Sequence, residues 1–172
     1  MASPQQPQQQ QQQQQSDTPW HAAFPAPQAT AATVSRAEVL QWLRERKARG
    51  PDGPAVDFVL VDLRRADHEG GTISTSINLP AQSLYPSLPV LYNVFKQAGV
   101  KKVVFYCGSS RGRGTRAGGW LADYIQSQGG EAETGLQSLV LEGGIKGWVA
   151  AGADYVEMMD GYDASVWQNL SN

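Results

Sequence analysis

An apolar run that leads straight into a glycine-rich loop is the feature that most constrains the fold of this chain. Residues 103–106 (Val-Val-Phe-Tyr) are β-branched or aromatic, which is typical of a buried strand. From Thr115 onward the apolar residues recur at the spacing of one helix face: Ala117, Trp120, Leu121, Tyr124 and Ile125. The sequence therefore predicts a strand that ends at Cys107, then a loop, then the N-terminus of a helix.

The residue types in this loop predict an anion-binding nucleophile. Cys107 is the chain's single cysteine, and a helix N-terminus both lowers the pKa of a nearby thiol and binds anions. Arg113 completes a Cys-x5-Arg spacing, and a guanidinium binds a tetrahedral oxyanion through two parallel hydrogen bonds. A buried structural cysteine is the alternative, but the cationic, glycine-rich sequence that follows favours a cradle. We predict that its oxyanion-binding loop is Gly108, Ser109, Ser110, Arg111 and Gly112.

Composition limits the class of protein. With 172 residues, 41% of them hydrophobic, the chain has enough apolar sequence for one ordinary domain. One cysteine excludes an internal disulfide and favours a reducing compartment, and neither a signal peptide nor a membrane-length apolar run is visible. We expect a soluble cytoplasmic or nuclear protein without a membrane partner. The net charge of -2 argues against nucleic-acid binding, and no residue pattern implies a metal or another cofactor.

The two ends of the chain are predicted to lie outside the main domain. Residues 1–33 are predicted to be a disordered leader, because a glutamine tract at 8–15 precedes Pro- and Ala-rich sequence with little charge. Trp20, His21 and Phe24 interrupt this leader as candidates for folding back on the domain. His21 is interpreted as incidental rather than as a metal ligand, since no second ligand cluster accompanies it. Residues 154–172 are a tail that either covers an exposed edge or contacts a partner.

Between these ends, strands alternate with helices. Ser35 and Glu38 form a capping box that opens a helix to about Lys47, and short strands are predicted at 58–61, 77–79 and 138–141. A further helix is predicted to open at Pro89 and end at Gly99, with one apolar side formed by Leu91, Val94, Phe95 and Ala98.

This alternation, without hairpin signals, predicts a single α/β domain over residues 34–153, with a mainly parallel central sheet flanked by helices. In such sheets ligands bind beyond the carboxyl ends of the strands, where Asp62 and Cys107 fall.

Three groups of residues, in this order, carry a family resemblance. Residues 61–64 (Val-Asp-Leu-Arg) precede Glu69-Gly70-Gly71-Thr72-Ile73, Cys107 follows, and residues 141–145 (Leu-Glu-Gly-Gly-Ile) precede Trp148 and Gly152. Together they resemble the rhodanese-like fold over residues 34–153. Cys107 to Arg113 is similar to the longer active-site loop of the cell-division-cycle-25 phosphatases and the yeast-type arsenate reductases, whereas sulfurtransferases carry a tighter loop.

The resemblance implies an enzyme: a protein tyrosine or dual-specificity phosphatase that forms a phospho-intermediate on Cys107 and acts on a phosphorylated protein or small oxyanion. The alternatives are an arsenate reductase that uses glutathione or glutaredoxin as an external thiol, a thiosulfate-type sulfurtransferase, and a non-catalytic phosphoanion-binding module. Catalysis is expected from Cys107 and Arg113, with support from Asp62, Arg64, Glu69 and Gly114.

Three departures from the family pattern concern acid–base chemistry. Thr72 and Tyr106 each stand where the family usually has histidine, and no acidic residue lies between Cys107 and Arg113. Asp62 and Glu69 are therefore the candidate general acids, with Asp62 interpreted chiefly as a residue that holds the Cys107 loop by hydrogen bonds.

Overall fold

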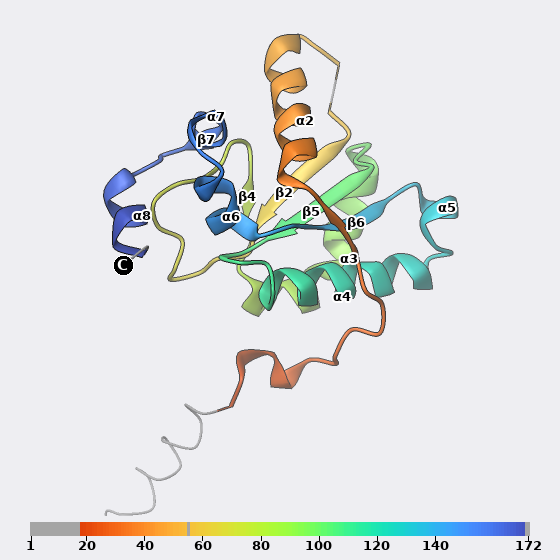
Figure 1. Ribbon diagram of the computed structural model, residues 1–172. Helices are drawn as coiled ribbons and strands as arrows, with labels where there is room; N and C mark the ends of the chain where they lie inside the picture. Colours follow the sequence, from red (N-terminus) through yellow and green to blue (C-terminus); the bar gives the residue numbers. More distant parts are fainter. Residues whose placement is uncertain (1–17, 55, 171–172) are drawn as a thin grey trace, which may run out of the picture.

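The centre of the fold is a parallel sheet that places the Cys107 loop at its carboxyl edge. A computed structural model describes residues 18–54 and 56–170 (Figure 1). Within them, five parallel strands run in the order β1-β6-β5-β2-β4. Their bounds are β1 Ala32–Val34, β2 Phe58–Asp62, β4 Ile77–Asn78, β5 Lys102–Tyr106 and β6 Gln137–Leu141. The predicted α/β fold with a mainly parallel sheet is confirmed.

Helices cover both faces of the sheet (Figure 1). The larger ones are α2 Arg36–Arg49, α3 Ala81–Gln97 and α4 Arg113–Ser127, and the shorter ones are η1 Trp20–Ala23, α5 Glu131–Thr134, α6 Gly144–Ala150, α7 Ala153–Val156 and α8 Ala164–Leu170. One core lies between the sheet and α3 and α4, where Phe105 and Trp120 are buried. The other lies on the opposite face under α2 and α6, around Tyr106 and Trp148. Neighbouring residues of β5 therefore feed two separate cores, as the alternation of a strand requires.

Helix α3 differs from its prediction. It begins at Ala81 rather than at Pro89, and it contains Pro86 and Pro89. Its buried face is Ala81, Leu84, Leu88, Tyr92 and Phe95, whereas Val94, predicted to face inward, is 51% exposed. Both prolines are on the exposed side, so burial of the apolar stripe outweighs the hydrogen bonds that they remove.

The ordered chain begins before residue 34. Strand β1 pairs with β6 from Ala32 onward, and the rings of Trp20 and Phe24 pack against Trp120 with centroids 6.1 and 5.8 Å away. The fold-back of these aromatic residues on the domain is confirmed, and within residues 18–33 the prediction of disorder is wrong because this segment has a buried surface to pack on. The glutamine tract lies outside the described residues.

The C-terminal tail covers the segment that follows β2. Strand β7 Met159–Asp160 pairs antiparallel with β3 Thr72–Ile73, and Trp167 donates from its indole nitrogen to the Gly70 carbonyl at 2.7 Å. Of the two roles considered for the tail, it has the first, covering a part of its own domain. Among the residues described, none of the helices is both long and apolar enough to cross a membrane.

Candidate active site

Cys107 lies where β5 ends, at a cavity of about 420 Å³. Its side chain is 3% exposed, and helix α4 begins six residues later at Arg113. The predicted order of strand, loop and helix N-terminus is thus present. The described residues that line the cavity with it are Trp20, His21, Asp67, Gly108, Ser109, Gly112, Arg113, Arg116 and Lys146.

The start of α6 holds the Cys107 loop in place. The backbone N–H groups of Ile145 and Lys146 donate to the carbonyls of Cys107 and Gly108, each at 3.0 Å. Such an approach requires glycine at 144, because a Cβ there would lie 2.5 Å from the Cys107 carbonyl oxygen. Gly144 therefore serves the active loop indirectly, since its missing side chain lets the Ile145 and Lys146 N–H groups reach and satisfy these two carbonyls.

Only part of the predicted oxyanion loop faces the cavity. Gly108, Ser109 and Gly112 line it, whereas Ser110 is buried in the wall of the loop and Arg111 is exposed outside the lining. Ser110 has a φ of 62°, accepts a long bond from the Cys107 N–H (3.5 Å) and accepts the Thr115 hydroxyl at its carbonyl (2.7 Å).

A Cβ at Gly114 would lie 3.0 Å from the Ser110 Cβ, so Gly114 supports the loop by leaving room for this strained residue.

Arg113 is oriented by a carboxylate that the sequence prediction missed. Its Nη1 donates to Asp67 Oδ1 at 2.7 Å, and its Nη2 pairs with Oδ2 of the same carboxylate. The hydrogen bond to Asp67 raises the pKa of Arg113, with a smaller contribution from the Cys107 side chain. Conversely, the bond from Arg113 holds the pKa of Asp67 well below its usual range. At neutral pH both groups are charged, and the guanidinium is fixed beside the thiol.

The role predicted for Asp62 needs correction, because Asp62 is paired with Arg64. Asp62 is 0% exposed and Arg64 2% exposed, and the guanidinium binds the carboxylate at 2.7 to 3.1 Å. Arg64 also donates to the carbonyls of Glu69 and Gly71, and the Thr72 hydroxyl donates to Asp62. This buried pair therefore shapes the 69–72 segment instead of holding the Cys107 loop. Because Asp62 is sealed from the cavity, it is not positioned to protonate a leaving group.

Glu69 likewise lies outside the cavity lining. Its side chain is exposed, and its backbone carbonyl accepts a hydrogen bond from Arg64. Neither sequence candidate for the general acid is therefore placed at the thiol.

The two positions where histidine was expected contact each other. The Thr72 hydroxyl lies 2.7 Å from the Tyr106 hydroxyl, which also donates to Ser76 at 2.7 Å and accepts from the Ile73 N–H at 3.2 Å. Burial raises the pKa of the Tyr106 phenol. Tyr106 packs in the core opposite to that of Cys107, so these paired hydroxyls support β3 and do not tune the thiol.

Sequence reasoning missed four residues that line the cavity: Trp20, His21, Asp67 and Lys146. Lys146 follows the Gly143-Gly144 signature, which was a usable signal for its position near the loop. Asp67 reaches the cavity from a turn, and Trp20 and His21 reach it from the four-residue helix η1. Such segments are too short for a periodicity to predict which side chains converge.

The family relationship rests on a domain match. The model of the rhodanese-like domain matches residues 39–151, which is well over half of the chain. The chain belongs to the rhodanese-like family. The matched region contains Cys107 and Arg113 and excludes the leader that carries His21.

Similar proteins include an arsenical-resistance protein, a phosphatase and a reductase. The chain is 28% identical to arsenical-resistance protein 2 of Saccharomyces cerevisiae over 117 residues, which is 64% of this chain and 88% of that protein. A yeast protein tyrosine phosphatase of the rhodanese family superposes with a TM-score of 0.62 at 26% identity, covering 81% of this chain and 98% of that one. The arsenic–antimony reductase of Leishmania major shares the fold, with a TM-score of 0.62 at 21% identity. The match covers 75% of this chain and 84% of that one. These relatives support the resemblance to the yeast-type Cys-x5-Arg group.

Proposed function

We propose that this protein is a cysteine-dependent phosphatase that hydrolyses phosphomonoesters through an intermediate on Cys107. The observation that carries the proposal is the charge around the thiol. Among the described residues that line the cavity, Arg113, Arg116 and Lys146 are cationic, and Asp67 is the one carboxylate. A dianionic phosphoryl group fits such a cavity better than a neutral or cationic substrate does.

The reaction follows from this geometry. The Cys107 thiolate attacks phosphorus, so that an S–P bond forms as the bond to the leaving oxygen breaks. Arg113 and the N–H groups of the loop stabilise the equatorial oxygens as charge develops on them. Water then attacks the phosphocysteine, releasing phosphate and regenerating the thiolate. Asp67 acts as a positioning residue, since it fixes the plane of the guanidinium.

Arsenate reduction is the second candidate, and the identity to arsenical-resistance protein 2 favours it. Arsenate is a tetrahedral oxyanion like phosphate and would bind the same cradle. Because the chain has one cysteine, the two electrons that reduce arsenate to arsenite would come from external thiols such as glutathione or glutaredoxin, which become a disulfide. Either activity suits a cytoplasmic or nuclear protein in a reducing environment.

The deciding experiment is hydrolysis of an activated aryl phosphate by the full chain, beside assays of arsenate with glutathione and glutaredoxin and of thiosulfate with cyanide. We expect Cys107→Ser to abolish hydrolysis and Arg113→Ala to lower kcat by roughly 10²–10³-fold, as removal of an oxyanion donor does. Arg111→Ala is the matched control, because Arg111 lies in the same loop outside the cavity lining. It should change kcat by less than about twofold.

Turnover of arsenate without hydrolysis of the aryl phosphate would overturn the phosphatase proposal in favour of an arsenate reductase. Sulfur transfer from thiosulfate alone would overturn it in favour of a sulfurtransferase. Phosphate or arsenate binding that survives Cys107→Ser, with no turnover, would leave a binding module.

A further inference from the structure

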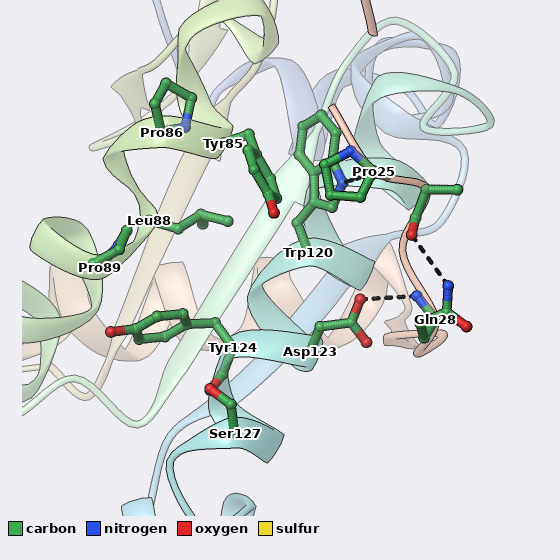
Figure 2. Close-up of a pocket in the computed structure, with 11 residues that line it drawn as sticks. Pro25, Gln28, Tyr85, Pro86, Leu88, Pro89, Trp120, Asp123, Tyr124 and Ser127 are labelled. Carbon is green, nitrogen blue, oxygen red and sulfur yellow. Dashed lines mark hydrogen bonds between the residues drawn. The ribbon is translucent and has the colours of Figure 1, made fainter. Parts of the chain in front are cut away.

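The described part of the leader is docked on α4 by hydrogen bonds far apart in sequence. The Trp120 indole donates to the Pro25 carbonyl at 2.8 Å. The Asp123 carboxylate accepts the backbone N–H of Gln28 at 2.8 Å (Figure 2). It also accepts the backbone N–H of Ala29, at 2.7 Å. Asp123 and Pro25 lie in the wall of a groove of about 640 Å³, separate from the cavity at Cys107.

Helix α4 is shaped to receive this segment. A Cβ at Gly119 would lie 2.7 Å from the Pro27 Cβ and 2.8 Å from the Ala29 carbonyl oxygen. A Cβ at the preceding Gly118 would first meet Val140 of β6, at 2.6 Å, and then the Ala31 Cβ at 3.0 Å. Glycine inside a helix costs about 0.5–1 kcal/mol relative to alanine. Gly119, whose nearest neighbours all belong to the leader, therefore indicates that the close fit of the leader matters to the folded state.

Aromatic contacts connect the docked leader to the cavity at Cys107. Trp20 meets Trp120 edge-on with ring centroids 6.1 Å apart, and His21 meets Trp20 edge-on at 5.4 Å. The guanidinium of Arg116 lies over the Trp120 ring, 6.0 Å from the ring centroid. Both Trp20 and His21 then line the cavity that contains Cys107.

The cavity needs a group that can give up and take back a proton. Asp67 is committed to Arg113 as a carboxylate, whereas guanidinium and ammonium groups keep their protons near neutral pH. Histidine is the side chain best suited to exchange a proton there. Among the described residues lining the cavity, His21 is the one histidine.

We propose that His21 is a catalytic residue of this site, donating the proton to the leaving-group oxygen, and that the docked leader exists to place it there. The inference rests on the proposed phosphatase function and adds the acid that the loop lacks. It also assigns an active role to a segment outside the family's domain.

The proton balance is closed by His21 itself. As Cys107 displaces the leaving oxygen from phosphorus, the His21 imidazolium protonates that oxygen and becomes neutral, releasing an alcohol. Neutral His21 then takes a proton from the water that attacks the phosphocysteine, so that phosphate leaves and both groups return to their starting states.

The test compares two substrates with the full chain. An activated aryl phosphate leaves without help, whereas an alkyl phosphate needs protonation. We expect His21→Gln to lower kcat on the alkyl phosphate by roughly 10²–10⁴-fold and on the aryl phosphate by a few-fold at most. Equal losses on the two substrates, or none, would overturn the role of His21 while Cys107-dependent hydrolysis by the parent still supported the phosphatase.

A parent chain without Cys107-dependent hydrolysis would overturn the phosphatase and this inference together.

A second variant separates placement from folding. Asp123→Ala removes the anchor of the leader at the separate groove, so we expect a loss of about 10–10²-fold confined to the alkyl phosphate. The double variant with His21→Gln should be no worse than His21→Gln alone, because both act through one group. Additive losses would contradict the proposal, and thermal unfolding of each variant checks that it is folded.

Discussion

Asp67 fixes the orientation of Arg113, the cation predicted to bind the substrate beside Cys107. A guanidinium has five N–H donors, and the paired contact with this carboxylate uses one from each terminal nitrogen. The remaining donors stay available to an anion beside Cys107. A half-exposed carboxylate thus orients Arg113 without neutralising the whole cavity, in which Arg116 and Lys146 add positive charge.

The pH dependence of stability tests this pair at the residue scale. The pKa of Asp67 lies below its ordinary value of 3.8, so the unfolded chain takes up this proton first as the pH falls. The pair therefore stabilises the folded state above about pH 4, and that contribution is lost as the pH falls toward the folded-state pKa. Replacing Asp67 by Asn should cost only about 0–1 kcal/mol at pH 7, because the pair is partly exposed.

The measurement is the melting temperature between pH 7 and pH 2.5. We expect Asp67→Asn to fall less steeply below pH 4 than the parent, whereas Asp52→Asn, in an exposed turn, should keep the parent's slope. Parallel curves for parent and Asp67→Asn would rule out an ion pair at this position in solution.

At the scale of elements, α6 packs closely against the Cys107 loop. Gly144 has a φ of +57°, and a Cβ there would lie within 2.6 Å of two loop carbonyl oxygens. We expect Gly144→Ala to displace the loop and to lower kcat for the aryl phosphate by about 10²-fold, since a shift near 1 Å has that effect. It should also cost about 1–3 kcal/mol of stability through overpacking and strain.

The matched control is Gly99→Ala, which has a φ of +73° but nothing within 4 Å of its added Cβ. It isolates backbone strain, so it should lower stability without changing kcat. Equal kcat for the two alanine variants would mean that the contact with α6 does not shape the loop.

Elements with a clear period could be predicted from the sequence, and those without one could not. The buried strand at β5 and the apolar face of α4 follow from spacing alone, as does the capping box that starts α2. The predicted start of α3 was wrong because Pro89 suggested a boundary that tertiary burial overrides. Strands β3 and β7 have two residues each, too few for an alternation to be visible.

The site residues likewise divide into those that local sequence predicts and those that it does not. Cys107 and Arg113 lie in one continuous loop and helix start, so their neighbourhood follows from local sequence. Asp67 and His21 come from segments 40 and 86 positions before Cys107, and only the folded chain brings them to it. Asp62 was misassigned because a carboxylate at a strand end resembles a site residue until its buried partner, Arg64, is seen.

At the scale of the whole molecule, both ends of the described chain brace the site. The leader reaches the cavity with His21, and the tail covers the segment between Asp67 and β3. The Trp167 side chain, 8% exposed, donates to the Gly70 carbonyl, and a Cβ at Gly70 would lie 2.6 Å from its indole nitrogen. The tail therefore fixes the loop that also holds Asp67.

Removing this brace should affect substrate binding as well as stability. Trp167→Ala leaves a cavity, for which a loss of roughly 3–5 kcal/mol is typical. Because the loop then holds Asp67 and hence Arg113 less firmly, we expect KM for the aryl phosphate to rise more than kcat falls. Urea unfolding and steady-state kinetics below the transition measure both, and Tyr162→Ala, an exposed aromatic of the same tail, is the control. A loss of stability with KM unchanged would show that the tail supports the fold alone, because the loop would then hold Asp67 against Arg113 without Trp167.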